Sequence, residues 1–429
     1  MPITRQGGHN TKMNKMNIAI IGSGISGLSA AYLLHGQHNV TVFEKNAYVG
    51  GHSRTIAIKT PKQTLPVDTG FIVYNELNYP LLTGLFRHLG VETQKSDMSF
   101  GASIGNGAVE YGSNGMFAQK RNLLRPAFWG MIADILRFNR TAEKYIEAED
   151  MTLDECLKKM NMGAWFRNYY LLAMGAAIWS CPLETMMRFP AATFIRFFKN
   201  HGLLTVNGQP QWRTVVGGSQ EYVRKLSQGF SSKIQYSTPA KAIIRTANGV
   251  AVMDATGKSP VYDHVIFACH ADETLALLLD ASDQEKSILS AFTYQENRVV
   301  VHRDASFMPR HRKAWASWVY LSEDRGVKSP QVSLTYWMNN LQNLPADDTV
   351  LVTLNPGRRP AEETIYDEHV FSHPVFTCGA VRAQSRLGEI QGKNRAHFCG
   401  AWTRYGFHED GLMSGVAAAQ ALGAVIPWK

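Results

Sequence analysis

The stretch MNIAIIGSGISGLSAAYLLHG at residues 16–36 decides the fold of this protein. It begins with a short apolar run typical of a β-strand, passes through a glycine turn and continues as a helical stretch that ends at Gly36. The segment HNVTVFEKN at residues 38–46 follows as a second strand. A strand, a helix and a strand in this order predict a β-α-β unit with two parallel strands.

The glycine turn has the pattern G-x-G-x-x-G and comes directly after the first predicted strand. Gly22 makes the tight turn, Gly24 lets the backbone approach a pyrophosphate, and Gly27 allows close packing of helix on strand. The free N–H groups at the helix N-terminus favour phosphate. Glu44 ends the second strand 22 residues after Gly22, where a carboxylate accepts hydrogen bonds from a ribose diol. A chance glycine turn is the alternative, but this context predicts a bound dinucleotide.

Two further segments are rich in glycine. AYVGGHSRT at residues 47–55 adds a Gly50-Gly51 step, which brings more backbone toward the same phosphates and which plain NAD domains do not usually need. FCGAWTRYGFHEDGLMSG at residues 398–415 leads into a run of small apolar residues. Taken alone, this last segment could be a buried C-terminal helix capped by Asp410.

These three segments together resemble the flavin-containing amine oxidase superfamily, which includes protoporphyrinogen oxidases and phytoene desaturases. Over residues 16–425 the chain is similar to one branch, the predicted FAD-dependent oxidoreductases whose genes accompany cyclopropane fatty-acid synthase. VDTGFIVYNELNYP, FFKNHGLL, QWRTVVGGSQEYV and NPGRRP carry that similarity. The resemblance implies FAD, redox chemistry on a lipid acyl chain, and a lipid-modifying methyltransferase as a partner. The cofactor-binding residues that it and the motifs indicate are Gly22, Ser23, Gly24, Ile25, Ser26, Gly27, Glu44, Lys45, Gly50, Gly51, His52, Ser53, Gly70, Phe71, Ile72, Ala240, Gly400, Glu409, Asp410, Gly411 and Ser414.

Two side chains bear on whether FAD is attached covalently or non-covalently. His52 stands where the superfamily commonly has Arg; an imidazole can carry flavin covalently or only pack against it. Cys399 lacks the surrounding pattern of cysteinyl-flavin enzymes, so we expect non-covalent FAD. GASIGNGAVEYG at residues 101–112 has the wrong glycine spacing for a second nucleotide site. We therefore expect no NADPH site, with electrons leaving to oxygen, a quinone or a protein carrier.

The predicted fold class is α/β: a Rossmann-type FAD-binding domain (GR2-like) interwoven with an α+β substrate domain. Residues 234–269 are rich in strands, residues 76–200 are helical in period, and residues 290–355 are strand-like and aromatic. We assign three segments to the FAD-binding domain (16–75, 210–275 and 375–429) and two to the substrate domain (76–209 and 276–374).

Hydride transfer to a flavin needs a C–H bond held in a dry site and few acid-base groups. We expect an aromatic pocket, with a wall drawn from Phe71, Ile72, Tyr74, Trp179, Trp318, Tyr336 and Trp337. His302, in the predicted strand RVVVHRD, is the candidate polar group near the ring; a histidine satisfied within the sheet is the alternative. The candidate catalytic residues are therefore His302, Tyr336 and Trp179.

The composition limits location and partners. The net charge of +9 permits an anionic partner without requiring one, and we expect no nucleic-acid partner. Five cysteines without a C-x-x-C pair argue against disulfides and a metal site. Residues 1–16 do not read as a secretory signal, and no apolar run is long enough to span a bilayer, so we expect a cytoplasmic protein, at most peripheral to the inner face of the membrane.

Residues 120–140 could make that membrane contact. They carry five cations and one acid, with Phe128, Met131, Ile132, Ile135 and Phe138 on one helical face. Such a face either enters a membrane interface or packs onto the domain. FIRFFK at residues 194–199 could add to the same surface.

The expected activity is oxidation or isomerisation of an apolar substrate, most simply an unsaturated or modified fatty acyl chain. One rival is an amine oxidase acting on a small amine; it predicts an acidic entrance, and the net charge has the wrong sign. The other is a non-catalytic, flavin-bound partner of a lipid-modifying enzyme.

Overall fold

The computed structural model describes residues 15–147, 150–179, 186–205, 208–322 and 333–428. Its first layer is a five-stranded sheet in the order β10-β2-β1-β14-β20, in which every neighbouring pair is parallel. The strands are β10 (Ile234–Gln235), β2 (Asn39–Phe43), β1 (Asn17–Ile21), β14 (His264–Phe267) and β20 (Ala396–Phe398). They read as apolar runs because helices and a second small sheet cover both faces. This arrangement confirms the predicted fold class.

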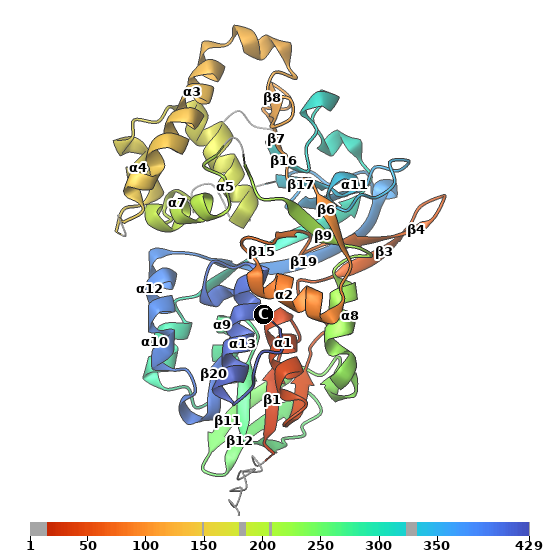
Figure 1. The fold of residues 1–429 in the computed structure, drawn as a ribbon, viewed down its shortest axis with the longest axis vertical. Coiled ribbons are helices and arrows are strands. Elements are labelled where there is room, and N and C mark those ends of the chain that lie inside the picture. Colours follow the sequence, from red (N-terminus) through yellow and green to blue (C-terminus); the bar gives the residue numbers. More distant parts are fainter. Residues whose placement is uncertain (1–14, 148–149, 180–185, 206–207, 323–332, 429) are drawn as a thin grey trace, which may run out of the picture.

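One face of the parallel sheet is covered by α1 (Ile25–Leu34), α13 (His408–Ala421), α2 (Pro80–Leu89) and α8 (Gln220–Ser227). The other face packs against α9 (Ala271–Leu277), α10 (Asp283–Leu289) and α12 (Cys378–Arg386) and the sheet of β11 (Ala240–Thr246), β12 (Gly249–Asp254) and β13 (Val261–Tyr262). These elements form the lower half of the view in Figure 1. Segments from both ends of the chain therefore build one domain.

A seven-stranded sheet forms the second domain, in the order β19-β15-β18-β17-β16-β7-β8, antiparallel except for the β16–β7 pair. Its strands are β19 (Ile365–Val375), β15 (Thr293–His302), β18 (Leu351–Leu354), β17 (Ser333–Trp337), β16 (Trp318–Ser322), β7 (Phe100–Ile104) and β8 (Val109–Gly112). The β7–β8 pair is GASIGNGAVEYG, which forms a hairpin and no nucleotide turn. Smaller elements join the domains: β3 (Thr55–Lys59), β4 (Thr64–Asp68), β5 (Tyr74–Asn75), β6 (Thr93–Ser96), β9 (Trp212–Val215) and α11 (Met338–Leu341).

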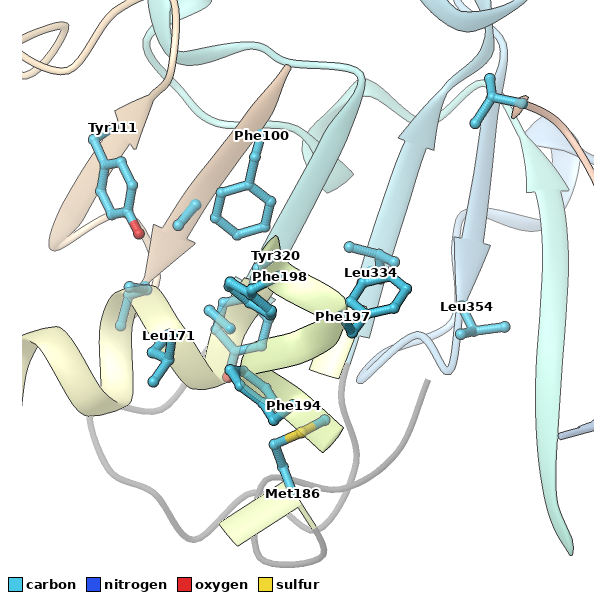
Figure 2. Close-up of a cluster of buried hydrophobic side chains, with 14 of the residues drawn as sticks. Phe100, Tyr111, Leu171, Met186, Phe194, Phe197, Phe198, Tyr320, Leu334 and Leu354 are labelled. Carbon is cyan, nitrogen blue, oxygen red and sulfur yellow. The ribbon is translucent and has the colours of Figure 1, made fainter. Parts of the chain in front are cut away.

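Four helices cover this sheet at the end of the molecule farthest from β11 and β12: α3 (Pro126–Thr141), α4 (Leu153–Lys159), α5 (Leu172–Trp179) and α7 (Ala191–Asn200) (Figure 1). Figure 2 shows Phe194, Phe197 and Phe198 of α7 directed at the strands that carry Tyr320 and Leu334. The apolar residues of FIRFFK are therefore buried in this core and do not join a membrane surface.

The apolar face predicted for residues 120–140 is also buried within the domain. Phe128, Met131, Ile135 and Phe138 of α3 are buried in the core of the second domain, and Ile132 packs against it. Of the two alternatives for this face, packing onto the domain is the one that the structure shows, because the domain itself covers these side chains. Within the described part of the chain, none of the helices has the length and apolar character needed to cross a bilayer.

The strands of the parallel sheet come from residues 16–75, 210–275 and 375–429, as the predicted segments require. The strands of the seven-stranded sheet come from the two predicted substrate segments, apart from the last residue of β19. The chain thus crosses between the domains several times. The boundaries themselves stay predictions.

Candidate active site

A cavity of about 1520 Å³ runs from the carboxyl ends of β1, β2, β14 and β20 to the space between α3, α5, α7 and the seven-stranded sheet. Ligands of open α/β sheets bind at this edge, where the strand order reverses on either side of β1. Single-ligand pockets commonly measure roughly 300–1,000 Å³, so this cavity has room for a dinucleotide and a second molecule. We call its two parts the sheet end and the chamber end.

The turn after β1 is shaped by its three glycines. Gly22 has φ +103°, and a Cβ on it would lie 2.7 Å from the carbonyl oxygen of Ala268. A Cβ on Gly27 would lie 2.0 Å from the carbonyl oxygen of Gly22, so only glycine lets α1 start so close to the strand. A Cβ on Gly24 would meet nothing within 4 Å, because this residue faces the cavity. The three roles agree with those read from the motif.

Glu44 follows β2 and lines the sheet end. Its carboxylate accepts hydrogen bonds from the backbone N–H of Ser23 (3.1 Å), the Ser23 hydroxyl and the backbone N–H of Asn46 (2.7 Å). These donors fix the carboxylate at the mouth of the glycine turn. Anionic oxygens in this place suit a ribose diol and repel a 2′-phosphate.

The Gly50-Gly51 step lies against the first glycine turn. The Gly50 N–H donates to the carbonyl of Ser23 at 2.9 Å, with φ +115° at Gly50. A Cβ on Gly51 would lie 3.1 Å from the Cα of Gly24. Two stretches of bare backbone thus share one wall of the cavity, which is the surface a pyrophosphate needs.

His52 also lines the sheet end, and its Nε2 atom is buried without a hydrogen-bond partner. Its ring stacks on Phe371 at 4.7 Å between centroids and lies 5.2 Å from the ring of His373. Burial, reinforced by the neighbouring imidazoles, holds the pKa of His52 well below its usual value. An unpartnered donor or acceptor beside two glycine turns fits a polar cofactor.

The C-terminal segment completes the sheet end. Gly400 follows β20, lines the cavity and donates its N–H to the Ser414 hydroxyl at 2.8 Å. Gly411 and Gly415 let α13 lie directly on α1: a Cβ on Gly415 would be 2.2 Å from the carbonyl oxygen of Ser26. The two ends of the chain therefore meet at one site.

Of the 21 predicted cofactor residues, fifteen line the cavity and six do not. Those that line it are Gly22, Ser23, Gly24, Ile25, Ser26, Glu44, Lys45, Gly50, Gly51, His52, Gly70, Phe71, Ile72, Ala240 and Gly400. Those that do not are Gly27, Ser53, Glu409, Asp410, Gly411 and Ser414. The second group shapes the turns and helices around the site.

The placement of the two acids differs from the expectation. Glu409 accepts hydrogen bonds from the backbone N–H groups of Leu81 (2.8 Å) and Leu82 (2.9 Å), so it caps the first turn of α2. Asp410 accepts from the N–H of Phe407 at 3.0 Å and caps α13 itself. Burial raises the pKa of Asp410 to about 6. Neither carboxylate faces the cavity, because each satisfies a helix N-terminus.

The chamber end is apolar and aromatic. Trp318 and Tyr336 line it from neighbouring strands, with their rings edge to face at 5.0 Å. The other apolar residues of this end include Phe100, Tyr111, Met116, Ile132, Ile135, Leu136, Tyr170, Met174, Ile178, Phe197 and Leu203. Tyr74 and Trp337, which were expected in the wall, lie outside it. The side chain of Trp179 falls outside the described part of the chain.

His302 is placed away from the cavity. It ends β15, is fully buried, and has both ring nitrogens occupied: Nε2 bonds the Thr353 hydroxyl at 2.7 Å and Nδ1 accepts from the N–H of Asp304 at 3.1 Å. Burial lowers its pKa to about 4. The predicted role beside the flavin does not fit this position; the residue is a histidine satisfied within the sheet.

His408, which the sequence did not single out, lines the cavity and stacks on Phe71, which it did. The rings of His408 and Phe71 stack at 3.9 Å with an angle of 11°, and both residues line the cavity. His408 Nε2 is 2.6 Å from the Tyr222 hydroxyl, and burial lowers the pKa of this imidazole to about 3. His408 belongs to the glycine-framed C-terminal segment, so its place before Glu409 was an available signal.

Two histidines of β19 also line the cavity and were not predicted from the sequence. His369, Phe371 and His373 alternate along β19 and all line the cavity. The period of two in EHVFSHPVF was the signal that could have placed them on one face of a strand.

Cys399 is fully buried and does not line the cavity, whereas His52 does. Non-covalent attachment stays a prediction.

The chain is similar to known flavoenzymes. Human amine oxidase [flavin-containing] B is 27% identical over 254 residues, covering 56% of this chain and 47% of the human protein. The chain spans about half the length of the curated relatives it matches.

Two solved structures show the same fold. A fatty acid isomerase from P. acnes that produces CLA has a TM-score of 0.68 and is 14% identical, over 95% of this chain and 99% of that one. A mutant of putrescine oxidase has a TM-score of 0.69 at 14% identity, covering 95% and 98%. These two structural likenesses concern the fold.

The sequence pattern of the flavin containing amine oxidoreductases matches residues 25–423, from the start of α1 to the end of α13. That range includes Glu44, the Gly50-Gly51 step, Gly400 and the whole chamber end. The sheet end fits FAD in its glycine turns, its carboxylate and its unpartnered His52 nitrogen. The protein therefore belongs to the flavin-containing amine oxidoreductase family.

Proposed function

We propose that this protein is an FAD-dependent oxidoreductase that oxidises or isomerises a fatty acyl chain by hydride transfer. The observation that carries this proposal is the apolar chamber end, which is continuous with the FAD site. The two lysines that line the cavity, Lys45 and Lys241, both lie at the sheet end, and none of the described lining residues at the chamber end is Lys or Arg. A buried carboxylate would find no cation there, whereas a hydrocarbon chain fits.

The protein has little acid-base chemistry to perform in such a reaction. Bound FAD supplies the two-electron acceptor or donor for hydride. The side chains of Trp318, Tyr336 and Met174 exclude water and hold a flexible chain in a few conformations. Holding the substrate in position and excluding water from the site can account for a large part of a hydride-transfer rate. The fatty acid isomerase among the solved structures has the same fold, which is compatible with this use of it.

A second candidate, oxidation of a small amine, rests on Asp97. This residue lines the cavity, and its Oδ1 atom accepts hydrogen bonds from the Ser99 N–H (2.8 Å), the Ser317 hydroxyl (2.7 Å) and the Asn340 amide (3.0 Å). Its Oδ2 atom has no hydrogen-bond partner among the described residues. A carboxylate oriented in this way could receive an ammonium group.

One experiment separates the two candidates. The purified yellow protein is incubated with phospholipids that carry unsaturated acyl chains, with free fatty acids and with a panel of amines. Flavin bleaching without oxygen, peroxide release in air, and acyl products by mass spectrometry are recorded. The proposal expects acyl products that Asp97→Asn leaves unchanged. Peroxide release from an amine, abolished by Asp97→Asn, would replace it with the amine oxidase.

A further inference from the structure

Exposed apolar side chains gather on α3 and on the segment just before it. Leu124 is 86% exposed, and Trp129, Leu123, Leu136 and Phe117 are also exposed. The rings of Phe117 and Trp129 are 5.3 Å apart, and the Trp129 indole N–H donates to the carbonyl of Leu123 at 3.0 Å. We call these five residues the α3 patch. Trp129 and Leu136 belong to α3, Leu123 and Leu124 to the 3-10 helix Lys120–Leu124 before it, and Phe117 to the preceding turn. The ring of Phe117 lies 5.9 Å from that of Phe128, which the core buries.

The patch is rimmed by cations. Lys120 and Arg140 are exposed and have no hydrogen bond or ion pair among the described residues. Arg121 is held at the same end by the carbonyls of Gly107 (2.8 Å) and Ala108 (2.6 Å). The acid of the helix, Asp134, is already engaged by Arg137 at 2.7 Å. Exposed apolar groups within a net positive rim are the composition that anionic membrane surfaces attract.

The patch and the cavity lining meet on α3. Ile132, Ile135, Leu136 and Asn139 of α3 line the chamber end. Leu136 is 50% exposed and belongs to both the patch and the cavity lining. Figure 1 shows α3 at the end of the molecule opposite the parallel sheet, so a flat surface could meet α3 without touching the FAD domain.

We infer that the α3 patch docks on an anionic lipid bilayer and that the cavity takes the acyl chain of a membrane lipid directly from it. This inference rests on the proposed function for the identity of the chain, but the docking can be measured without it. The polar headgroup stays outside, next to Lys120 and Arg140, while the hydrocarbon passes Leu136 into the chamber. This arrangement needs no cation inside the chamber to neutralise a carboxylate, and the described lining there offers none.

The docking is tested by sedimenting the full-length, FAD-loaded protein with phosphatidylcholine vesicles, with and without phosphatidylglycerol. We expect binding to the anionic vesicles that weakens as salt is raised. The double variant Leu124→Asp/Trp129→Ser should lower the binding constant by at least about tenfold, since both side chains lose apolar contact. Lys120→Glu and Arg140→Glu should each lower it by about fivefold or more.

Leu279→Asp is the matched control, because Leu279 is 65% exposed but follows α9, which packs on the parallel sheet. It should bind vesicles as the unchanged protein does. FAD content should be equal in all these variants, and turnover of a detergent-dispersed acyl substrate should be unchanged in Leu279→Asp and in Leu124→Asp/Trp129→Ser. Equal vesicle binding by the Leu124→Asp/Trp129→Ser variant, or self-association in analytical ultracentrifugation that the same variant abolishes, would overturn the inference. Docking as expected with no acyl turnover would leave the docking standing and refute the proposed function.

Discussion

The sheet end and the chamber end belong to one cavity but are built by different means. At the sheet end, bare backbone makes the surface: a Cβ on Gly51 would lie only 3.1 Å from the Cα of Gly24, so a side chain at Gly51 would press on the first glycine turn. At the chamber end, single side chains from distant elements make the surface, such as Ile132 of α3, Phe197 of α7 and Trp318 of β16. A backbone surface tolerates few sequences, whereas a hydrocarbon wall tolerates many. The choice of residues is therefore tightly constrained at the sheet end and loosely constrained at the chamber end.

The largest expected effect comes from a pair of glycine substitutions at the sheet end. Gly415→Val places a side chain against the Ser26 carbonyl, 2.2 Å from the Cβ position, and should lower the free energy of unfolding by about 3 kcal/mol or more. Gly24→Val meets only the cavity, so the FAD-free protein should stay within about 0.5 kcal/mol of the original but lose its colour. Urea unfolding and the FAD-to-protein ratio measure both. A Gly24→Val protein that keeps stoichiometric FAD contradicts the assignment of the sheet end.

Acid should destabilise the FAD-free protein. Burial lowers the pKa of five imidazoles to about 3 or 4: His201, His302, His373, His397 and His408. The unfolded chain takes up protons near pH 6.5 and the folded chain only near pH 4, so stability is lost as the pH falls through this window. Asp68 and Asp410, whose pKa values burial raises to about 6, act in the opposite direction between about pH 6 and 4. The imidazoles outnumber them, and urea midpoints measured from pH 7 to pH 4 should decrease. Constant or rising midpoints would show that these imidazoles titrate normally.

A substitution of His302 distinguishes a structural role of this residue from a catalytic one. His302→Asn cannot keep the bonds to both Thr353 and Asp304, and leaving buried groups unpaired should cost about 1–3 kcal/mol. The acid dependence described above should also become shallower, because one of the five imidazoles is gone. Turnover per bound FAD should not change, since the residue does not line the cavity. A loss of turnover with unchanged stability would restore its predicted catalytic role.

The smallest effect is expected at Glu409. Glu409→Gln keeps one acceptor for the N–H groups of Leu81 and Leu82 but turns an NH₂ toward the other, which should cost about 1 kcal/mol of stability. The flavin absorption spectrum and the FAD content should be unchanged. Weakened FAD binding in this variant would mean that the acid acts on the cofactor after all.

The sequence anticipated the sheet end well and the chamber end in outline. Gly22, Gly24, Glu44, Gly50 and Gly400 could be assigned because the spacing of glycines along the chain reports directly on local backbone geometry. Glu409 could not, because its partners in α2 are more than three hundred residues away along the chain. Burial along α3 was read as one apolar face, but which side met solvent depended on the sheet beneath it. Leu124 and Trp129 therefore became visible as a surface only in the folded chain.

What the sequence by itself determined is the β-α-β unit, the nucleotide-binding turn and the kind of cofactor, because turns and strand ends depend on a few residues that are close together in the chain. What only the tertiary structure decided is which aromatic side chains meet at the chamber end, that His302 lies outside it, and that His408 stacks on Phe71. Those contacts join residues from separate segments, and packing of whole elements sets them. No short stretch of sequence contains that information.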